Sequence, residues 1–213
     1  MAKIFVDMLG AIIGSVGKVS YYMRYSDNIA RRKGAERKSS DSPAAVEQRK
    51  RFGMLVELTK SLQPAIVIGF PQRKRGLSAG NAFHQLNKDI CTVEGDIITV
   101  DYEHLLCANG QLVVPDVTVS YQTANSKLAF VQTAMEEEVN CNADDLVYGV
   151  LLEKEKGFCR LVQLRVRGEG GSTSAALPQG WKKENLIVYT FALSANKKKA
   201  SKSQFLELEE EAC

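Results

Sequence analysis

The chain has 213 residues, of which 45% are hydrophobic and 25% charged, and its formal net charge at pH 7 is +3. This length allows a substantial core in one domain, or a small domain with an appendage. No apolar run approaches the eighteen or so residues that a membrane span needs, so we expect no membrane contact. The apolar run 1–17 is interrupted by Asp7 and continues into a strand-like pattern, which favours structure over a cleaved signal peptide.

The five cysteines are widely separated in the chain. Their number is odd and no CxxC spacing occurs, so neither a disulfide framework nor a zinc site is expected. Buried thiols are the default interpretation, and the sequence also lacks an Asn-x-Ser/Thr glycosylation signal. These features favour a cytoplasmic protein.

Charge is unevenly distributed along the chain. Residues 1–75 hold 15 Lys+Arg and 6 Asp+Glu, whereas residues 76–213 hold 13 Lys+Arg and 19 Asp+Glu. The N-terminal part is therefore basic, which suits either an anionic partner or the acidic remainder of the chain.

The first predicted element is a β-hairpin. Apolar and polar residues alternate over 19–25, which indicates a half-buried strand. The turn-forming residues 26–28 follow, and 29–33 can return as the second arm.

Two helices are expected next. Ser42 is a good N-cap, Pro43 suits the first helical position, and Pro64 ends this helix. Its apolar face carries Phe52 and Leu55, among others. Residues 65–70 then form an apolar connection, and 77–90 form the second helix.

From residue 92 the pattern becomes β. Short runs rich in β-branched and aromatic residues recur about every ten residues over 96–102, 111–115, 116–122, 127–133, 145–153, 158–167, 172–178, 185–194 and 203–209. This spacing is typical of an antiparallel sandwich. We therefore expect a mainly β (α+β) protein with three parts: a basic hairpin plus two-helix module over 1–91, a β-sandwich over 92–208, and an acidic tail over 209–213.

Three motifs carry a resemblance to a known family. They are the G-x-x-G-K-V-x-x-Y start at 14–22, the Q-R-x-x-F helix motif at 48–52, and L-P-x-x-W at 177–181. Over nearly the whole chain, the sequence resembles a family of roughly 200-residue proteins from Bacteroidetes-type bacteria that is catalogued as a domain of unknown function. The resemblance implies an Ig-like or fibronectin-like sandwich in a cytoplasmic protein, with a phage or mobile-element association. It carries no activity, so it assigns no functional residues.

The candidate binding surface is the basic N-terminal part. Cations beside Tyr21, Tyr22 and Tyr25 are typical of a surface that neutralises phosphates and stacks on bases. The alternative is a solvated face with the tyrosines packed inward. The candidate polyanion-binding residues are Lys18, Arg24, Arg31, Arg32, Lys33, Arg49, Lys50 and Arg51, with Arg37 and Lys38 between them.

No catalytic, cofactor-binding or metal-binding residue is assigned. Gly17 and Lys18 resemble a phosphate loop, but Val19 stands where such a loop needs Ser or Thr. His84 and His104 have no metal-ligand spacing, and His104 and Cys107 would lie on opposite faces of a strand. We interpret Asp144, Asp145 and Glu136–Glu138 as acidic loops. The sequence therefore favours a protein that is not an enzyme and has no cofactor.

Trp181, the one tryptophan, follows a Pro-Gly turn. It either contacts a partner or closes one end of the sandwich. Taken together, these patterns favour a non-enzymatic structural or protein-interaction protein that binds a protein partner or a second copy, as part of an assembly. Nucleic-acid binding through the basic hairpin and helix is the alternative function.

Overall fold

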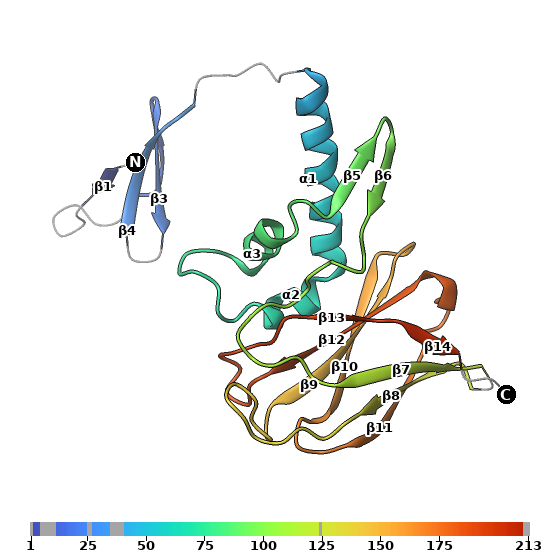
Figure 1. The fold of residues 1–213 in the computed structure, drawn as a ribbon. Helices are drawn as coiled ribbons and strands as arrows, with labels where there is room; N and C mark the ends of the chain where they lie inside the picture. Colours follow the sequence, from blue (N-terminus) through green and yellow to red (C-terminus); the bar gives the residue numbers. More distant parts are fainter. Residues whose placement is uncertain (1, 5–11, 25–26, 35–40, 124, 211–213) are drawn as a thin grey trace. The chain divides into compact units, whose positions relative to one another are not determined.

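The computed structural model describes residues 2–4, 12–24, 27–34, 41–123 and 125–210. The chain divides into two compact units, Met1–Pro43 and Ala44–Cys213. The fold is mainly β, with three helices and several sheets (Figure 1). The boundary predicted after residue 91 lies inside the second of these units, in which the helices and the strands after them share a core.

The N-terminal unit contains one antiparallel sheet with the strand order β1-β4-β3-β2. The predicted hairpin is present as β3 (Val19–Arg24) and β4 (Asp27–Arg32). The flanking strands, β1 (Ala2–Ile4) and β2 (Gly14–Val16), were not predicted. Gly17 has φ +53° and opens the two-residue loop between β2 and β3, where the first position of a type II′ turn requires a positive φ.

The prediction of two helices is wrong, because the described residues form three: α1 (Pro43–Ser61), α2 (Gln63–Gly69) and α3 (Ala79–Leu86). Pro64 lies in the first turn of α2. A proline there loses no helical hydrogen bond, so it begins a new helix as readily as it ends the previous one. The second predicted helix, 77–90, shortens to α3, whose N-cap Ser78 accepts a 3.1 Å hydrogen bond from the Asn81 N–H.

The buried line of α1 differs slightly from the predicted one. Leu55, Leu58 and Leu62 are buried at helical spacing, whereas Phe52 is 54% exposed. Together with α2 and α3, this line packs against β9 (Leu146–Glu153) and β12 (Leu186–Leu193), forming the first core cluster. This shared core is the reason that the helices belong to the larger unit.

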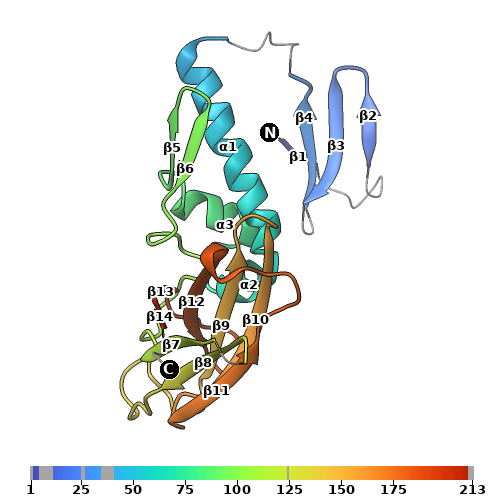
Figure 2. The same ribbon diagram turned by 90° about the vertical axis from the view of Figure 1, so that its right-hand side faces the viewer.

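Most strands of the larger unit form two four-stranded sheets (Figure 2). The first sheet has the order β10-β9-β12-β13 and adds β10 (Phe158–Val166) and β13 (Gln204–Leu206) to the two strands named above. The second has the order β11-β8-β7-β14, with β7 (Val117–Gln122), β8 (Lys127–Gln132), β11 (Gly171–Ala176) and β14 (Leu208–Glu210). A short 3-10 helix, Lys183–Asn185, precedes β12. The predicted strand over 111–115 is reduced to one isolated bridge from Leu112 to Ser201.

The sheet that contains β9 and β12 is covered on both faces. Along β9, Val150 and Leu152 belong to the first core cluster, whereas Val147 and Leu151 belong to a second cluster shared with the other sheet. Side chains alternate between faces along a strand, so this strand is buried on both sides. The layers are therefore helices, sheet and sheet, which explains why both strands are almost continuously apolar.

Asn87 joins α3 to the segment that follows β6 (Ile97–Val100). Its buried Nδ2 donates to the carbonyls of Phe83 and Leu106, both at 2.9 Å, and its Oδ1 accepts a 2.9 Å hydrogen bond from the Leu106 N–H. One side chain thus satisfies three backbone groups and holds the end of α3 in place.

Among the described residues, no helix is both long enough and apolar enough to cross a membrane.

Candidate functional site

Four of the predicted polyanion-binding residues gather at one end of the N-terminal sheet. We call Lys18, Arg31, Arg32 and Lys33 the hairpin cation cluster. The backbone N–H of Lys33 donates a 2.7 Å hydrogen bond to the Lys18 carbonyl, which brings the two ends of the cluster together. Lys18, Arg32 and Lys33, with Gly34, line a hollow of about 570 Å³. All four side chains are exposed, and no described carboxylate forms an ion pair with any of them.

The other predicted members of the hairpin surface do not join this cluster. Arg24 pairs in register with Asp27 at the opposite end of the hairpin. Tyr21 and Tyr22 are neighbours on β3, so they lie on opposite faces of the sheet. Tyr25, Arg37 and Lys38 lie outside the described residues. The described tyrosines therefore do not form one stacking platform.

The three helix cations are engaged within their own unit. Lys50 Nζ donates 2.7 Å hydrogen bonds to the Gly95 carbonyl and to Asp96 Oδ1, in the loop between β5 (Cys91–Glu94) and β6. The hydrogen bond from Lys50 to the Asp96 carboxylate, together with the Lys50 charge, holds the pKa of Asp96 below its ordinary value. Arg51 forms an (i, i+4) ion pair with Glu47, and Arg49 also has a partner. These residues stabilise α1 and the β5–β6 hairpin beside it. Of the eight predicted polyanion-binding residues, only the four of the hairpin cation cluster therefore present unpaired charge.

The structure separates the two groups that a Cys–His pair would need. His104 is exposed, and its Nδ1 lies 2.8 Å from Asp101 Oδ2. Cys107 is fully buried, and burial raises the pKa of its thiol to about 12. A thiol with this pKa stays protonated near neutral pH, so it is a poor nucleophile.

The other histidine, His84, lies between α1 and α3. Its Nε2 is 2.7 Å from Thr59 Oγ1, and the ring of Phe52 meets it edge-on at a centroid distance of 5.4 Å. These contacts account for His84 as a packing residue. Within the described residues, no group of three or more His, Cys, Asp or Glu side chains is arranged to hold a metal ion.

Trp181 is half-buried and packs against the second core cluster, the one between the two sheets. Its backbone N–H donates a 3.1 Å hydrogen bond to the Pro178 carbonyl, which closes the turn before it. The ring thus covers one part of the core, and its role as a partner contact stays a prediction.

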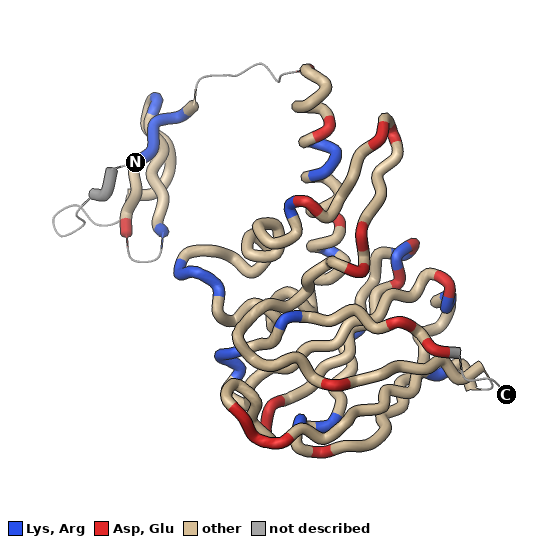
Figure 3. The backbone as a smooth tube through the Cα atoms, viewed as in Figure 1, with Lys and Arg blue, Asp and Glu red and all other residues tan. Residues whose placement is uncertain are grey.

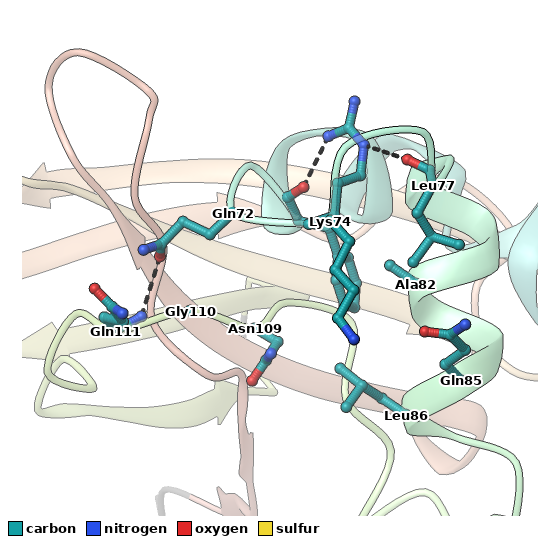
Figure 4. A pocket seen from close by; sticks show the side chains of 11 residues that line it. Gln72, Lys74, Leu77, Ala82, Gln85, Leu86, Asn109, Gly110 and Gln111 are labelled. Atoms are coloured by element: carbon teal, nitrogen blue, oxygen red, sulfur yellow. Dashed lines mark hydrogen bonds between the residues drawn. The ribbon is translucent and has the colours of Figure 1, made fainter. Parts of the chain in front are cut away.

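A pocket of about 330 Å³ lies between the loop that follows α2, the helix α3 and the loop 109–111 (Figure 4). We call it the α2–α3 pocket. Its apolar lining comprises Phe70, Leu77, Ala82 and Leu86. Its carboxamide lining comprises Gln72, Gln85, Asn109 and Gln111. Arg73, Lys74 and Gly110 complete the lining, and no carboxylate is part of it.

Two side chains fix the loop that follows α2. Arg73 Nε donates a 3.0 Å hydrogen bond to the Leu77 carbonyl, and its Nη1 donates a 2.8 Å bond to the Phe70 carbonyl. Gln72 Oε1 accepts a 3.1 Å hydrogen bond from the Gln111 N–H, across the pocket rim (Figure 4). Two of the five guanidinium N–H groups and the amide oxygen are therefore occupied by the fold itself.

The opposite rim depends on a glycine. A Cβ atom on Gly110 would collide with the Ala200 carbonyl and with Gln72 Oε1. The loop 109–111 approaches this backbone so closely that only glycine fits. The close approach holds the loop against the end of β12 and its following turn.

Lys74 differs from its neighbours in the pocket. Its side chain extends across the opening, with the ammonium between Leu86 and Asn109 (Figure 4). The Lys74 side chain is exposed and forms no ion pair or hydrogen bond with the part of the chain that the structure describes. Arg73, Lys74 and Arg75 form a run of cations in this loop (Figure 3). None of these three cations is among the predicted binding residues, although their run in the sequence was an available signal.

No protein-family model matches the chain, and neither a curated protein nor a solved structure matches it. The geometry described above is therefore the basis of the functional proposals.

Proposed function

We propose that this protein is a non-enzymatic interaction protein that assembles with further copies of itself through its N-terminal sheet. The observation that carries this proposal is the small number of buried side chains in the described part of the N-terminal unit. Over residues 12–24, 27–34 and 41–43, the part of this unit whose burial the structure describes, only Asn28 and Ile29 are buried, whereas Ile13 is 73% and Val16 is 69% exposed.

A single-layer sheet of this size is unstable without a partner. Sheets need an apolar face covered by a second layer, and units of about 40 residues bury too little surface to fold alone. The strand β2 lies at one end of the sheet order, and all three of its residues are exposed. An exposed edge strand is a template for pairing with another strand.

Charge favours a second copy as that partner. Residues 1–43 hold 8 Lys+Arg and 4 Asp+Glu, so the N-terminal unit is cationic. The strand β14 lies at one end of the second sheet of the larger unit. It carries the exposed Glu209, and the exposed Glu207 lies just before it in the chain. Another copy therefore offers a strand edge of opposite charge.

The test is the oligomeric state of the full chain, measured by multi-angle light scattering over a range of concentrations. We expect oligomers for the wild type and monomers for the double variant Ile13→Lys/Val16→Lys, because charges on an edge strand oppose pairing. Val139→Lys is the matched control, since Val139 is 86% exposed in the larger unit. A monomeric wild type, or oligomers that persist in the double variant, would overturn the proposal.

Polyanion binding is the second candidate function, and the unpaired hairpin cation cluster favours it. Replacing all four cations of the cluster by Gln should remove retention on heparin and binding to single-stranded DNA. The control Lys50→Gln/Arg51→Gln should change neither, because these side chains already have carboxylate partners. If four phosphates are contacted, log K should fall against log salt with a slope of roughly −3. No retention on heparin at low salt would exclude this function.

We further propose that the strands have an Ig-like or fibronectin-like connectivity. We also propose that the protein is cytoplasmic and associated with a phage or a mobile element. The shared core between the two sheets supports the first part, and the resemblance to the Bacteroidetes-type family supports the second. Flanking genes for phage structural proteins or mobility functions would agree with the second part, whereas a secretion operon would oppose it.

A further inference from the structure

We propose that the α2–α3 pocket binds a small monoanionic ligand that joins one carboxylate to an apolar group of about the size of a leucine side chain. This inference is independent of the proposed self-assembly, because every residue that lines the pocket lies in Ala44–Cys213.

The charge of the ligand follows from the cations that remain available. Arg73 lines the pocket, but its guanidinium donates to the Leu77 and Phe70 carbonyls. Lys74 is the other cation in the lining, and no described carboxylate pairs with it. Arg73 keeps its charge and its other N–H groups, but these two bonds hold its guanidinium against the backbone, so the Lys74 ammonium is the cation positioned to pair with one carboxylate. A phosphate dianion usually takes several cationic or helix N-terminal donors.

The carboxamides indicate how the anion is oriented. Asn109 and Gln85 stand on either side of the Lys74 ammonium in Figure 4. Their NH₂ groups are neutral donors, which can add hydrogen bonds to a carboxylate without adding charge. An ammonium and two amides in one pocket lining suit a carboxylate that accepts from more than one direction.

The remaining lining indicates an apolar portion of the ligand. Leu77, Ala82 and Leu86 share one side of the pocket, and Leu86 is 45% exposed although it is a large apolar residue. A ligand that covers Leu86 would remove this apolar surface from water. The volume of about 330 Å³ is at the small end of the range for ligand sites, so it admits one such group.

The pocket is held in shape before any ligand arrives. Gln72 binds the backbone N–H of Gln111, Gly110 contacts the backbone at Ala200, and Asn87 fixes the end of α3. A ligand therefore loses little free energy to ordering the protein, which is the condition under which a small molecule binds measurably.

The experiment compares two probes that differ in one charge. N-acetyl-leucine carries the carboxylate, and N-acetyl-leucinamide has the same apolar group without it. Each is titrated to about 10 mM into the ¹⁵N-labelled full chain, and amide chemical shifts are followed. We expect N-acetyl-leucine to give saturable shifts at residues 72–86 and 109–111, with a Kd on the order of 1 mM, and the amide to bind at least about fivefold more weakly.

Two variants separate the pocket from the general charge of the protein. Lys74→Gln should abolish the preference for the carboxylate, whereas Lys202→Gln, at another exposed lysine, should leave it unchanged. Leu86→Ser should weaken both probes. Because Lys74 and Leu86 are exposed, these variants should keep the spectrum of a folded protein.

The outcomes are distinct. Equal shifts with both probes, no saturation, or a carboxylate preference that survives Lys74→Gln would each overturn the proposal. Inorganic phosphate that binds as tightly as N-acetyl-leucine would also overturn it. Tighter binding of acetyl-Gly-Gly-Leu than of N-acetyl-leucine would support the proposal and identify a peptide C-terminus as the source of the carboxylate. Equal binding of the two would also support it and identify a free small acid as the source.

Discussion

Asp145 and Arg167 form a fully buried ion pair, with Asp145 Oδ2 3.3 Å from Arg167 Nε and the two side chains 0% and 1% exposed. Arg167 Nη2 also donates a 2.6 Å hydrogen bond to the Val113 carbonyl. The backbone N–H of Arg167 donates a 2.8 Å bond to the Asp145 carbonyl. The pair therefore fastens the end of β10 to the segments before β7 and β9. Asp145 Oδ1 has no hydrogen-bond partner, so the carboxylate is incompletely satisfied.

We expect each single substitution in this pair to destabilise the protein strongly. Asp145→Asn or Arg167→Met leaves one buried charge without its partner, at a cost of about 3–5 kcal/mol in the free energy of unfolding. The double variant should lose less than the sum, because it leaves no uncompensated charge. Urea denaturation measures these values. Asp144→Asn, at the exposed neighbour, should stay within about 0.5 kcal/mol of the wild type; equal losses at positions 144 and 145 would contradict the burial argument.

Two glycines should respond to alanine in opposite directions. Gly110→Ala forces a Cβ into the Ala200 carbonyl and Gln72 Oε1, and we expect a loss of about 2 kcal/mol or more in the free energy of unfolding. Gly53→Ala lies on an exposed part of α1 with nothing within 4 Å of the new Cβ, so it should stabilise the protein by about 0.5–1 kcal/mol. The prediction fails if Gly110→Ala is as stable as the wild type.

Asn87 tests how α3 and the α2–α3 pocket are held. Asn87→Ala removes the partners of three backbone groups, and we expect a cost of about 2–4 kcal/mol. Asn87→Asp should cost more at neutral pH than at a pH where the new carboxyl is protonated, because a carboxylate faces the carbonyls of Phe83 and Leu106. Thermal unfolding at two pH values, with the wild type as reference, measures the difference.

We expect the protein to lose stability at alkaline pH, because burial hinders the ionisation of two of its thiols. Burial raises the pKa of Cys107 and of Cys159 to about 12, from an ordinary value of 9.0. The unfolded chain releases these protons first, so stability falls as pH rises from about 9 toward 12. The fall should be less steep in Cys107→Ala, which is the variant to compare in urea at each pH.

Alkylation provides an independent measurement of the same thiol. At pH 8 a thiol with a pKa of about 12 is ionised in roughly one molecule in ten thousand. Iodoacetamide should therefore leave Cys107 unmodified in the native protein and modify it in urea, as followed by peptide mass spectrometry. Equally fast modification in both states would show that Cys107 is accessible.

Local patterns predicted most strands and the first helix. Alternation predicted β3, the turn residues after it predicted the return strand β4, and the Ser42–Pro43 signal predicted the start of α1. The strands β9 and β12 were predicted from their β-branched and aromatic residues, because burial on both faces leaves their near-continuous apolar runs without alternation. The helix α2 was not predicted, because a short apolar run fits a connection as well as a helix.

The candidate sites depended more on tertiary contacts. Lys50 and Asp96 are 46 positions apart, and nothing near either residue in the chain indicates that they pair. Asp144 and Asp145 look alike in the sequence, yet only Asp145 is buried against Arg167. The α2–α3 pocket brings together the loop after α2 and the loop 109–111, which are far apart in the sequence.

The sequence by itself determined that this is a mainly β protein with a basic N-terminal hairpin, because side-chain periodicity and turn residues act over a few neighbouring positions. Only the tertiary structure decided which charges are neutralised and which remain available. Pairing depends on which surfaces meet when the sheets and helices close on their shared cores. That closure leaves the hairpin cation cluster and Lys74 without carboxylate partners among the described residues, while Lys50, Arg51 and Arg167 each have one.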